Sequence, residues 1–113
     1  MILATQPAMY RTGLTPEQQA LLWLGGVGEF QLTPGHPYYT VRAMAEGMRR
    51  YNDAMLQLCK AENVECIDLT GLDKSTATFY DDVHFNEAGA RAVAHIVAEH
   101  FKAHPPFAAA AAR

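Results

Sequence analysis

The segment Asp81-Asp82-Val83-His84-Phe85-Asn86-Glu87-Ala88-Gly89 places two carboxylates and a histidine just ahead of a predicted helix. A separation of three residues lets a turn bring the Asp81 carboxylate against the His84 imidazole. The carboxylate then fixes the tautomer of the ring and stabilises the imidazolium, which leaves the other ring nitrogen as a general base. Asp82 is one residue nearer and competes for this role. The pattern predicts an acid–base pair at Asp81 and His84, with an ordinary loop ahead of a helix as the alternative.

The elements that must hold this pair are predicted by apolar runs and helical periodicity. Residues 1–4 form an apolar strand that stops at Thr5-Gln6-Pro7, since proline cannot continue a central ladder. Residues 64–69 form a second strand, rich in β-forming side chains. This strand follows a predicted helix over residues 40–62 after a very short link. Such a link is typical of an α/β fold with a parallel sheet.

Capping signals delimit two further helices. Thr15-Pro16-Glu17-Gln18 has the form of a capping box with proline at the first helical position, so a short apolar helix is predicted from residue 16 to Gly25-Gly26. Asn86 is a good N-cap and Glu87 favours the positive end of the helix dipole. An amphipathic helix is therefore predicted to begin there and to end before Pro105.

Some side chains on these elements allow a binding interpretation beside a packing one. Met44, Met48 and Met55 share a face of the long helix, where packing against a sheet is favoured over a binding groove. Tyr38 and Tyr39, in an irregular loop, either line a substrate pocket or pack on the body of the protein.

Disulfide and metal chemistry have little support in the sequence. Cys59 and Cys66 are too few for a disulfide scaffold and wrongly spaced for a zinc knuckle, so two reduced, buried thiols are predicted. His36, between a glycine and a proline, is predicted to be an exposed loop residue. His100 and His104 have the i, i+4 spacing of metal ligands, but the sequence offers no third ligand, so a metal is not expected.

Length and charge narrow the class of protein. The chain has 113 residues and 50% hydrophobic content, which suits one domain or part of one. A net charge of −3, with nine scattered Lys and Arg, provides no basic stripe and argues against nucleic-acid and anionic-membrane partners. No apolar run reaches the roughly 20 residues of a membrane helix. Residues 1–5 lack the features of a signal peptide, and the compartment stays open.

Residues 81–89 resemble the carboxy-terminal catalytic block of the SGNH hydrolases, also called the GDSL family. In that family an Asp-x-x-His ahead of a small-residue helix supplies the acid and base of a Ser-His-Asp triad. Residues 1–7 resemble its late strand ending in Thr-Gln-Pro, Tyr51-Asn52 resembles part of its long helix, and residues 64–69 resemble its last core strand. The resemblance covers nearly all of the chain in the same order.

The resemblance implies a fold, a reaction and two site residues. Asp81 would orient His84, and His84 would deprotonate a serine that attacks an ester or acyl carbonyl. The implied fold is α/β, a three-layer α/β/α arrangement of flavodoxin-like, SGNH type with a parallel sheet between helices. The implied substrates are small-molecule carboxylic esters, including acetylated sugars and lipid esters, and no metal or other cofactor is implied.

The chain departs from the family where the nucleophile should be. The family's Gly-Asp-Ser block and Gly-x-Asn-Asp block, which carry the nucleophile and oxyanion donors, do not occur, and the one serine, Ser75, lies outside any nucleophile turn. We therefore expect residues 1–104 to be the carboxy-terminal part of a single SGNH-like hydrolase domain that supplies the Asp-His part of the triad and is inactive alone. Residues 105–113 are expected to form a Pro/Ala tail, either ordered or disordered.

Two strands do not make a stable parallel sheet. We therefore expect the chain either to self-associate or to bind a missing amino-terminal half. The alternative is a non-enzymatic α/β interaction module that binds through a strand edge or an apolar helix face. A third, weaker option is a self-sufficient enzyme that uses Ser75.

Overall fold

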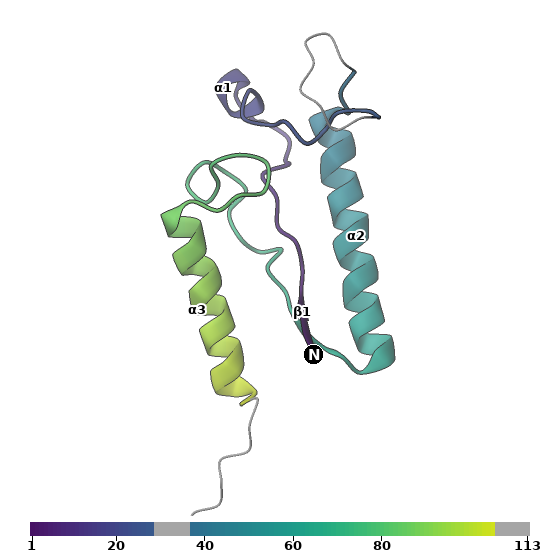
Figure 1. Ribbon diagram of the computed structural model, residues 1–113, viewed down its shortest axis with the longest axis vertical. Helices are drawn as coiled ribbons and strands as arrows, with labels where there is room; N and C mark the ends of the chain where they lie inside the picture. Colours follow the sequence, from purple (N-terminus) through teal and green to yellow (C-terminus); the bar gives the residue numbers. More distant parts are fainter. Residues whose placement is uncertain (29–36, 106–113) are drawn as a thin grey trace, which may run out of the picture.

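The computed structural model describes residues 1–28 and 37–105, and within them it is a mixed α/β structure with a two-stranded sheet (Figure 1). The elements in chain order are β1 (Ile2–Ala4), α1 (Pro16–Gln19), α2 (Val41–Glu62), β2 (Glu65–Ile67) and α3 (Glu87–Ala103). The strands are parallel, with Ile2 opposite Glu65 and Ala4 opposite Ile67. In Figure 1 the strands run between α2 and α3. His36 and the tail from residue 106 lie outside the described residues.

The cap residues delimit α2 and α3 as the sequence predicts. The Thr40 side chain accepts a hydrogen bond from the backbone N–H of Ala43, and α2 ends at Asn63 in the left-handed conformation, with φ of 52°. The Asn86 side chain accepts from the backbone N–H of Gly89 and starts α3, which ends ahead of Pro105. Both predicted helices and the parallel pairing of the two predicted strands are confirmed.

The short helix α1 is only partly as predicted. The capping box is present, because Thr15 and Gln18 exchange side-chain to backbone hydrogen bonds. The helix ends at Gln19, however, and the prediction that it continues to Gly25 is wrong. The physical reason lies in a buried carboxylate, Asp82, which binds the backbone N–H groups of Trp23 and Leu24 and so holds this segment out of the helix.

Polar side chains join the end of β1 to α2 and to β2. Asn52, buried in α2, accepts from the backbone N–H of Gln6 at 2.9 Å and donates to its carbonyl at 2.8 Å. Thr5 is also buried, and its hydroxyl accepts from the backbone N–H of Leu69 at 2.6 Å and donates to Asp68. These bonds satisfy the backbone where the chain leaves the two-stranded sheet, as buried polar groups require.

The prediction of two reduced thiols is wrong. Cys59 and Cys66 form a disulfide, with their Cα atoms 6.2 Å apart. Cys59 is in the last turn of α2 and Cys66 is the middle residue of β2. The left-handed Asn63 turns the chain back within three residues, and this brings the two side chains together. A separation of seven positions along the sequence does not reveal this contact.

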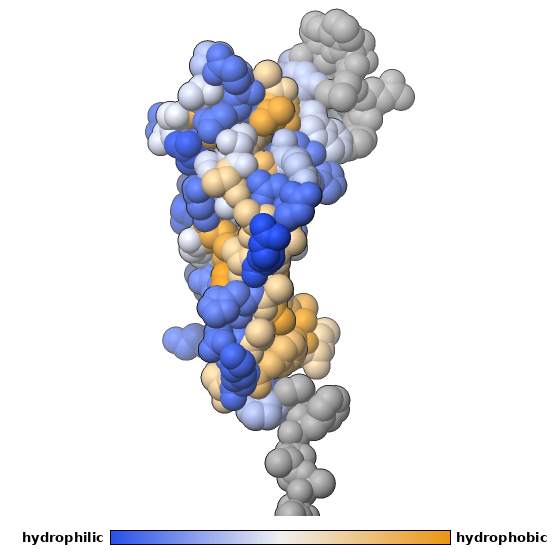
Figure 2. Space-filling view, turned by 90° about the vertical axis from the view of Figure 1, so that its left-hand side faces the viewer, coloured by the Kyte–Doolittle hydropathy of each residue, from blue (hydrophilic) through white to orange (hydrophobic). Residues whose placement is uncertain are grey.

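One cluster of buried apolar side chains lies at the end of the molecule that carries residues 70–86. Met9, Leu14 and Phe79 are at most 7% exposed, and the half-buried Leu22 and Phe85 pack against them. Figure 2 shows the face of the molecule that carries α3. Toward its lower end, hydrophobic residues lie at the surface beside hydrophilic ones. This buried cluster therefore lies under the loop that holds Asp81 and His84.

Two residues of the methionine stripe of α2 line a groove of ≈ 620 Å³, whereas the sequence favoured packing of the stripe against a sheet. Met44 and Met48 line it together with Tyr10, Tyr39 and Tyr51. The sequence left open whether Tyr39 lines a pocket or packs on the body of the protein. In the structure Tyr39 lines the groove.

Candidate functional site

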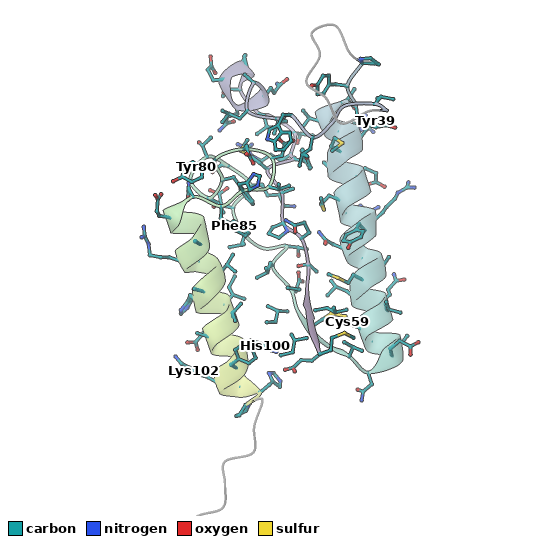
Figure 3. The ribbon with its side chains drawn as sticks, in the orientation of Figure 1. Tyr39, Cys59, Tyr80, Phe85, His100 and Lys102 are labelled. Atoms are coloured by element: carbon teal, nitrogen blue, oxygen red, sulfur yellow. A yellow bond between two sulfur atoms is a disulfide. The ribbon has the colours of Figure 1, made fainter. Side chains whose placement is uncertain are left out.

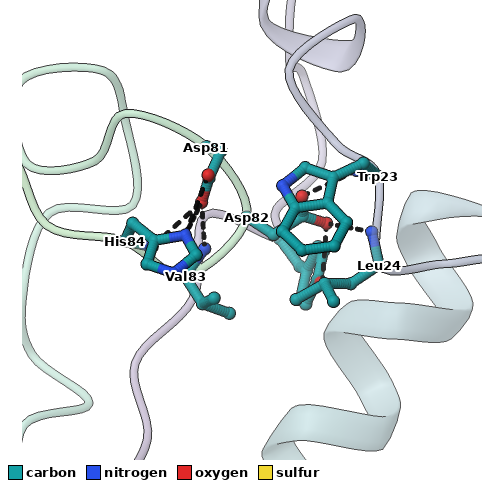
Figure 4. A network of polar contacts seen from close by, with 7 residues as sticks. Trp23, Leu24, Asp81, Asp82, Val83 and His84 are labelled. Carbon is teal, nitrogen blue, oxygen red and sulfur yellow. Dashed lines mark hydrogen bonds and ion pairs between the residues drawn. The ribbon is translucent and has the colours of Figure 1, made fainter. Parts of the chain in front are cut away.

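The Asp81–His84 turn brings the two side chains into contact, as their spacing predicts (Figure 4). His84 Nδ1 lies 2.9 Å from Asp81 Oδ2 and 3.0 Å from Oδ1. Asp81 Oδ1 also accepts the backbone N–H groups of Val83 at 3.1 Å and His84 at 3.0 Å. The carboxylate therefore fixes both the backbone of the turn and the orientation of the ring.

The electrostatics of the turn favour an ionised carboxylate beside the histidine. Partial burial by itself raises the pKa of Asp81, but hydrogen bonds from the backbone of His84 and Val83, and from the His84 and Trp23 side chains, outweigh it and lower that pKa to about 2. With Nδ1 facing the carboxylate, the basic lone pair belongs to Nε2. The His84 side chain is 63% exposed, and no residue in the described ranges is hydrogen-bonded to Nε2.

Asp82 does not compete for the histidine. Its side chain is fully buried and accepts hydrogen bonds from Tyr10 Oη at 2.8 Å and from the backbone N–H groups of Trp23 at 2.7 Å and Leu24 at 3.2 Å. Burial, together with the bond to Asp82 and its negative charge, raises the pKa of the Tyr10 hydroxyl. Asp82 therefore ties the segment after β1 and the segment after α1 to the turn.

Trp23 is a site residue that the sequence did not single out. Its indole is nearly parallel to the His84 ring, with an angle of 8° between the planes and 6.4 Å between the centroids. Its side chain also hydrogen-bonds to the Asp81 carboxylate. The sequence marks it only as the chain's one tryptophan, ahead of Gly25-Gly26, because its contact with residue 84 depends on the tertiary fold.

The turn is held against the start of α3 by backbone contacts. Tyr80 N–H donates to the carbonyl of His84 at 2.9 Å, and Asn86 N–H donates to the carbonyl of Thr78 at 2.9 Å. The Asn86 side chain reaches back to the carbonyl of Thr76. Gly89 lies so close to Thr78 that an added Cβ would overlap the Thr78 carbonyl oxygen. A glycine at this position lets α3 begin directly beneath the loop.

Ser75 is not arranged as the nucleophile of this pair. Its hydroxyl donates to Asp73 Oδ2 at 2.7 Å and accepts from the backbone N–H of Ala77 at 3.1 Å. Both bonds belong to the local turn, so this hydroxyl caps its own loop rather than donating to His84 Nε2.

His100 and His104, the predicted histidine pair, have a carboxylate neighbour. Their ligand nitrogens and a carboxylate oxygen of Glu65 all lie within 4.8 Å of one another. The expectation that no third metal ligand accompanies the pair is therefore wrong. Glu65 comes from β2, thirty-five residues before His100, and only the fold brings it there.

Comparisons with protein-family profiles, curated proteins and solved structures give no match to this chain. Among the described helices, none has the length and apolar character needed to cross a membrane.

Proposed function

We propose that Asp81 and His84 are the acid and base of a Ser-His-Asp ester hydrolase of the SGNH/GDSL type, working on a serine that this chain does not supply. The observation that carries the proposal is the contact of His84 Nδ1 with an ionised Asp81. A carboxylate on Nδ1 stabilises the imidazolium and leaves Nε2 to take a proton, which is the division of labour in such a triad.

Each atom of the pair has a defined role in this proposal. His84 Nε2 removes the proton from a serine hydroxyl as the oxygen attacks the ester carbonyl, and later returns a proton to the leaving alcohol. Asp81 stays ionised throughout. The nucleophile and the oxyanion donors come from a segment with a Gly-Asp-Ser block, and without them the pair has little catalytic effect.

The larger fold belongs to the same proposal. The parallel pair β1 and β2, between α2 and α3 in Figure 1, is the edge of a three-layer α/β/α domain whose other strands extend the sheet. Support comes from the rule that parallel sheets are covered on both faces and contain several strands. In such a sheet the ligand site lies beyond the carboxyl ends of the strands. The 70–86 loop follows the carboxyl end of β2.

The test begins with the coding sequence upstream of Met1. A Gly-Asp-Ser block in the same frame is expected, and the longer protein should hydrolyse a p-nitrophenyl acetate probe. His84→Ala in that protein should lower kcat by about 10⁴-fold, because it removes the general base. His95→Ala is the matched control, since His95 is an exposed histidine on α3 outside the loop. It should leave kcat unchanged.

Two outcomes would overturn the proposal. One is an upstream sequence with no Gly-Asp-Ser block, which would remove the nucleophile. The other is a longer, active protein in which His84→Ala hydrolyses the ester as fast as the His95→Ala control.

A second candidate function, an α/β interaction module, is favoured by exposed apolar side chains on α2. Tyr51 is 62% exposed and Leu58 53% exposed, and the groove beside Tyr51 is mostly apolar in its lining. Surfaces of this kind often bind protein partners. Under this candidate the chain self-associates or holds a partner over that face, and Tyr51→Asp should abolish the complex while His84→Ala leaves it intact, as size-exclusion chromatography would show.

A further inference from the structure

We propose that Glu65, His100 and His104 form a binding site for a divalent transition-metal ion, with Zn²⁺ as the expected ion. The site lies toward the end of α3 far from the Asp81–His84 loop, where His100 is seen beside the strands in Figure 3. It is a separate feature from the proposed hydrolase pair and does not depend on it.

The three side chains are already gathered. His100 Nε2 lies 2.7 Å from Glu65 Oε1, and the rings of His100 and His104 have centroids 4.9 Å apart. The His100 side chain is only 15% exposed and that of Glu65 is 37% exposed. Three ligand atoms within 4.8 Å of one another need only side-chain rotations to surround one ion.

The distances show how binding would occur. Tetrahedral Zn²⁺ with ligands at about 2.0–2.1 Å separates neighbouring ligand atoms by about 3.3 Å. The Glu65–His100 pair, now 2.7 Å apart, therefore opens by about 0.6 Å as the ion replaces the shared proton, and His104 closes in. His104 Nδ1 lies 3.3 Å from the His100 carbonyl oxygen. With Nδ1 donating to that carbonyl, Nε2 carries the lone pair that binds a metal.

The donor set selects the metal. Two imidazoles and one carboxylate are the ligands of open zinc sites, in which water takes the fourth position. Ca²⁺ and Mg²⁺ prefer oxygen ligands and are disfavoured by two nitrogens. The neighbouring Cys66 is committed to its disulfide with Cys59, so no thiolate joins the set.

The bound ion would fasten the last turn of α3 to β2. Among the described residues, the core at the other end of the molecule holds the start of α3 through Phe79 and Phe85, whereas the far end is tied to β2 by the Glu65–His100 bond. An ion with a third ligand from His104 adds a stronger link at that end, and binding that requires the folded arrangement stabilises it.

The test is a Zn²⁺ titration of the 113-residue chain, freed of metal with a chelator beforehand, followed by isothermal calorimetry at about pH 7.5. We expect one ion per chain and a rise in Tm. Glu65→Gln and His104→Ala should each weaken binding by about 100-fold, and Co²⁺ should give the absorption bands of a tetrahedral site in the wild type but not in these two variants. His95→Ala, another exposed histidine of the same helix, should bind as the wild type does.

Three results would overturn the site. The first is no heat of binding with excess Zn²⁺. The second is equal weakening by His95→Ala and His104→Ala, which would mean diffuse surface binding. The third is a stoichiometry of half an ion per chain with dimer formation, which would place the ion between copies. Glu65→Gln keeps the size of the side chain, and its circular dichroism spectrum checks that lost binding is not lost folding.

Discussion

Replacing Gly89 by alanine tests whether the loop that holds Asp81 and His84 depends on the close approach of α3 to Thr78. A Cβ at this position overlaps the Thr78 carbonyl oxygen and comes within 3.0 Å of its carbonyl carbon and Cγ2. Thr78 is buried, and its carbonyl accepts the Asn86 N–H at 2.9 Å. The loop and the helix must therefore separate, and that hydrogen bond must lengthen or break.

The expected loss can be estimated from these contacts. Forcing an extra methyl group into a packed site costs about 1–3 kcal/mol, and losing a buried hydrogen bond costs about 1 kcal/mol. Alanine returns about 1 kcal/mol through its better helix propensity. The net loss of about 1–3 kcal/mol lowers Tm by roughly 10 °C for a chain of this size.

The matched control is Gly47→Ala in α2. A Cβ at Gly47 meets nothing within 4 Å, so only the propensity gain remains and Tm should rise by a few degrees, roughly 4–8 °C. Thermal melts followed by circular dichroism measure both variants. If Gly89→Ala raises Tm as Gly47→Ala does, α3 does not press on Thr78 and the packing described under the loop is wrong.

Two further predictions concern Asp81 and the disulfide. The pKa of Asp81 is lowered from 3.8 to about 2, so its bonds stabilise the protein above about pH 4 and lose that effect as pH falls toward 2. Urea unfolding of wild type and Asp81→Asn should differ at neutral pH and converge near pH 2, and an unchanged difference there would contradict the assignment. Reducing the Cys59–Cys66 bond, which closes a short loop, should lower the free energy of unfolding by about 2.5 kcal/mol. Titration with a thiol reagent should find no free thiol before reduction, and two reactive thiols at that stage would contradict the disulfide.

The features predicted from the sequence are those encoded within a few residues of one another. The contact between Asp81 and His84 spans three positions, and the caps at Thr40 and Asn86 bind backbone groups three residues ahead. Turns and caps of this kind depend on residue type and spacing alone. The long helix α2 is also predicted from local information, because its apolar residues recur at helical spacing.

The features that the sequence did not predict join distant segments. The bond from Tyr10 to Asp82 spans seventy-two positions, and the bond from the Trp23 backbone spans fifty-nine. The bonds from the Trp23 and Leu24 backbone draw residues 20–24 out of the predicted helix, because a buried carboxylate gains more from two backbone donors than the helix loses. The contact between Glu65 and His100 likewise could not be predicted from the sequence, because thirty-five positions separate the two residues.

The contrast between the adjacent residues Asp81 and Asp82 has a consequence for the order of folding. Every described backbone donor to Asp81 lies within three residues of it, so the turn closes with little loss of chain entropy. Asp82 gains its partners only when segments more than fifty residues away have arrived. The histidine can therefore acquire its tautomer early, in a loop that is still mobile, whereas its fixed place beside Trp23 is a late event in folding.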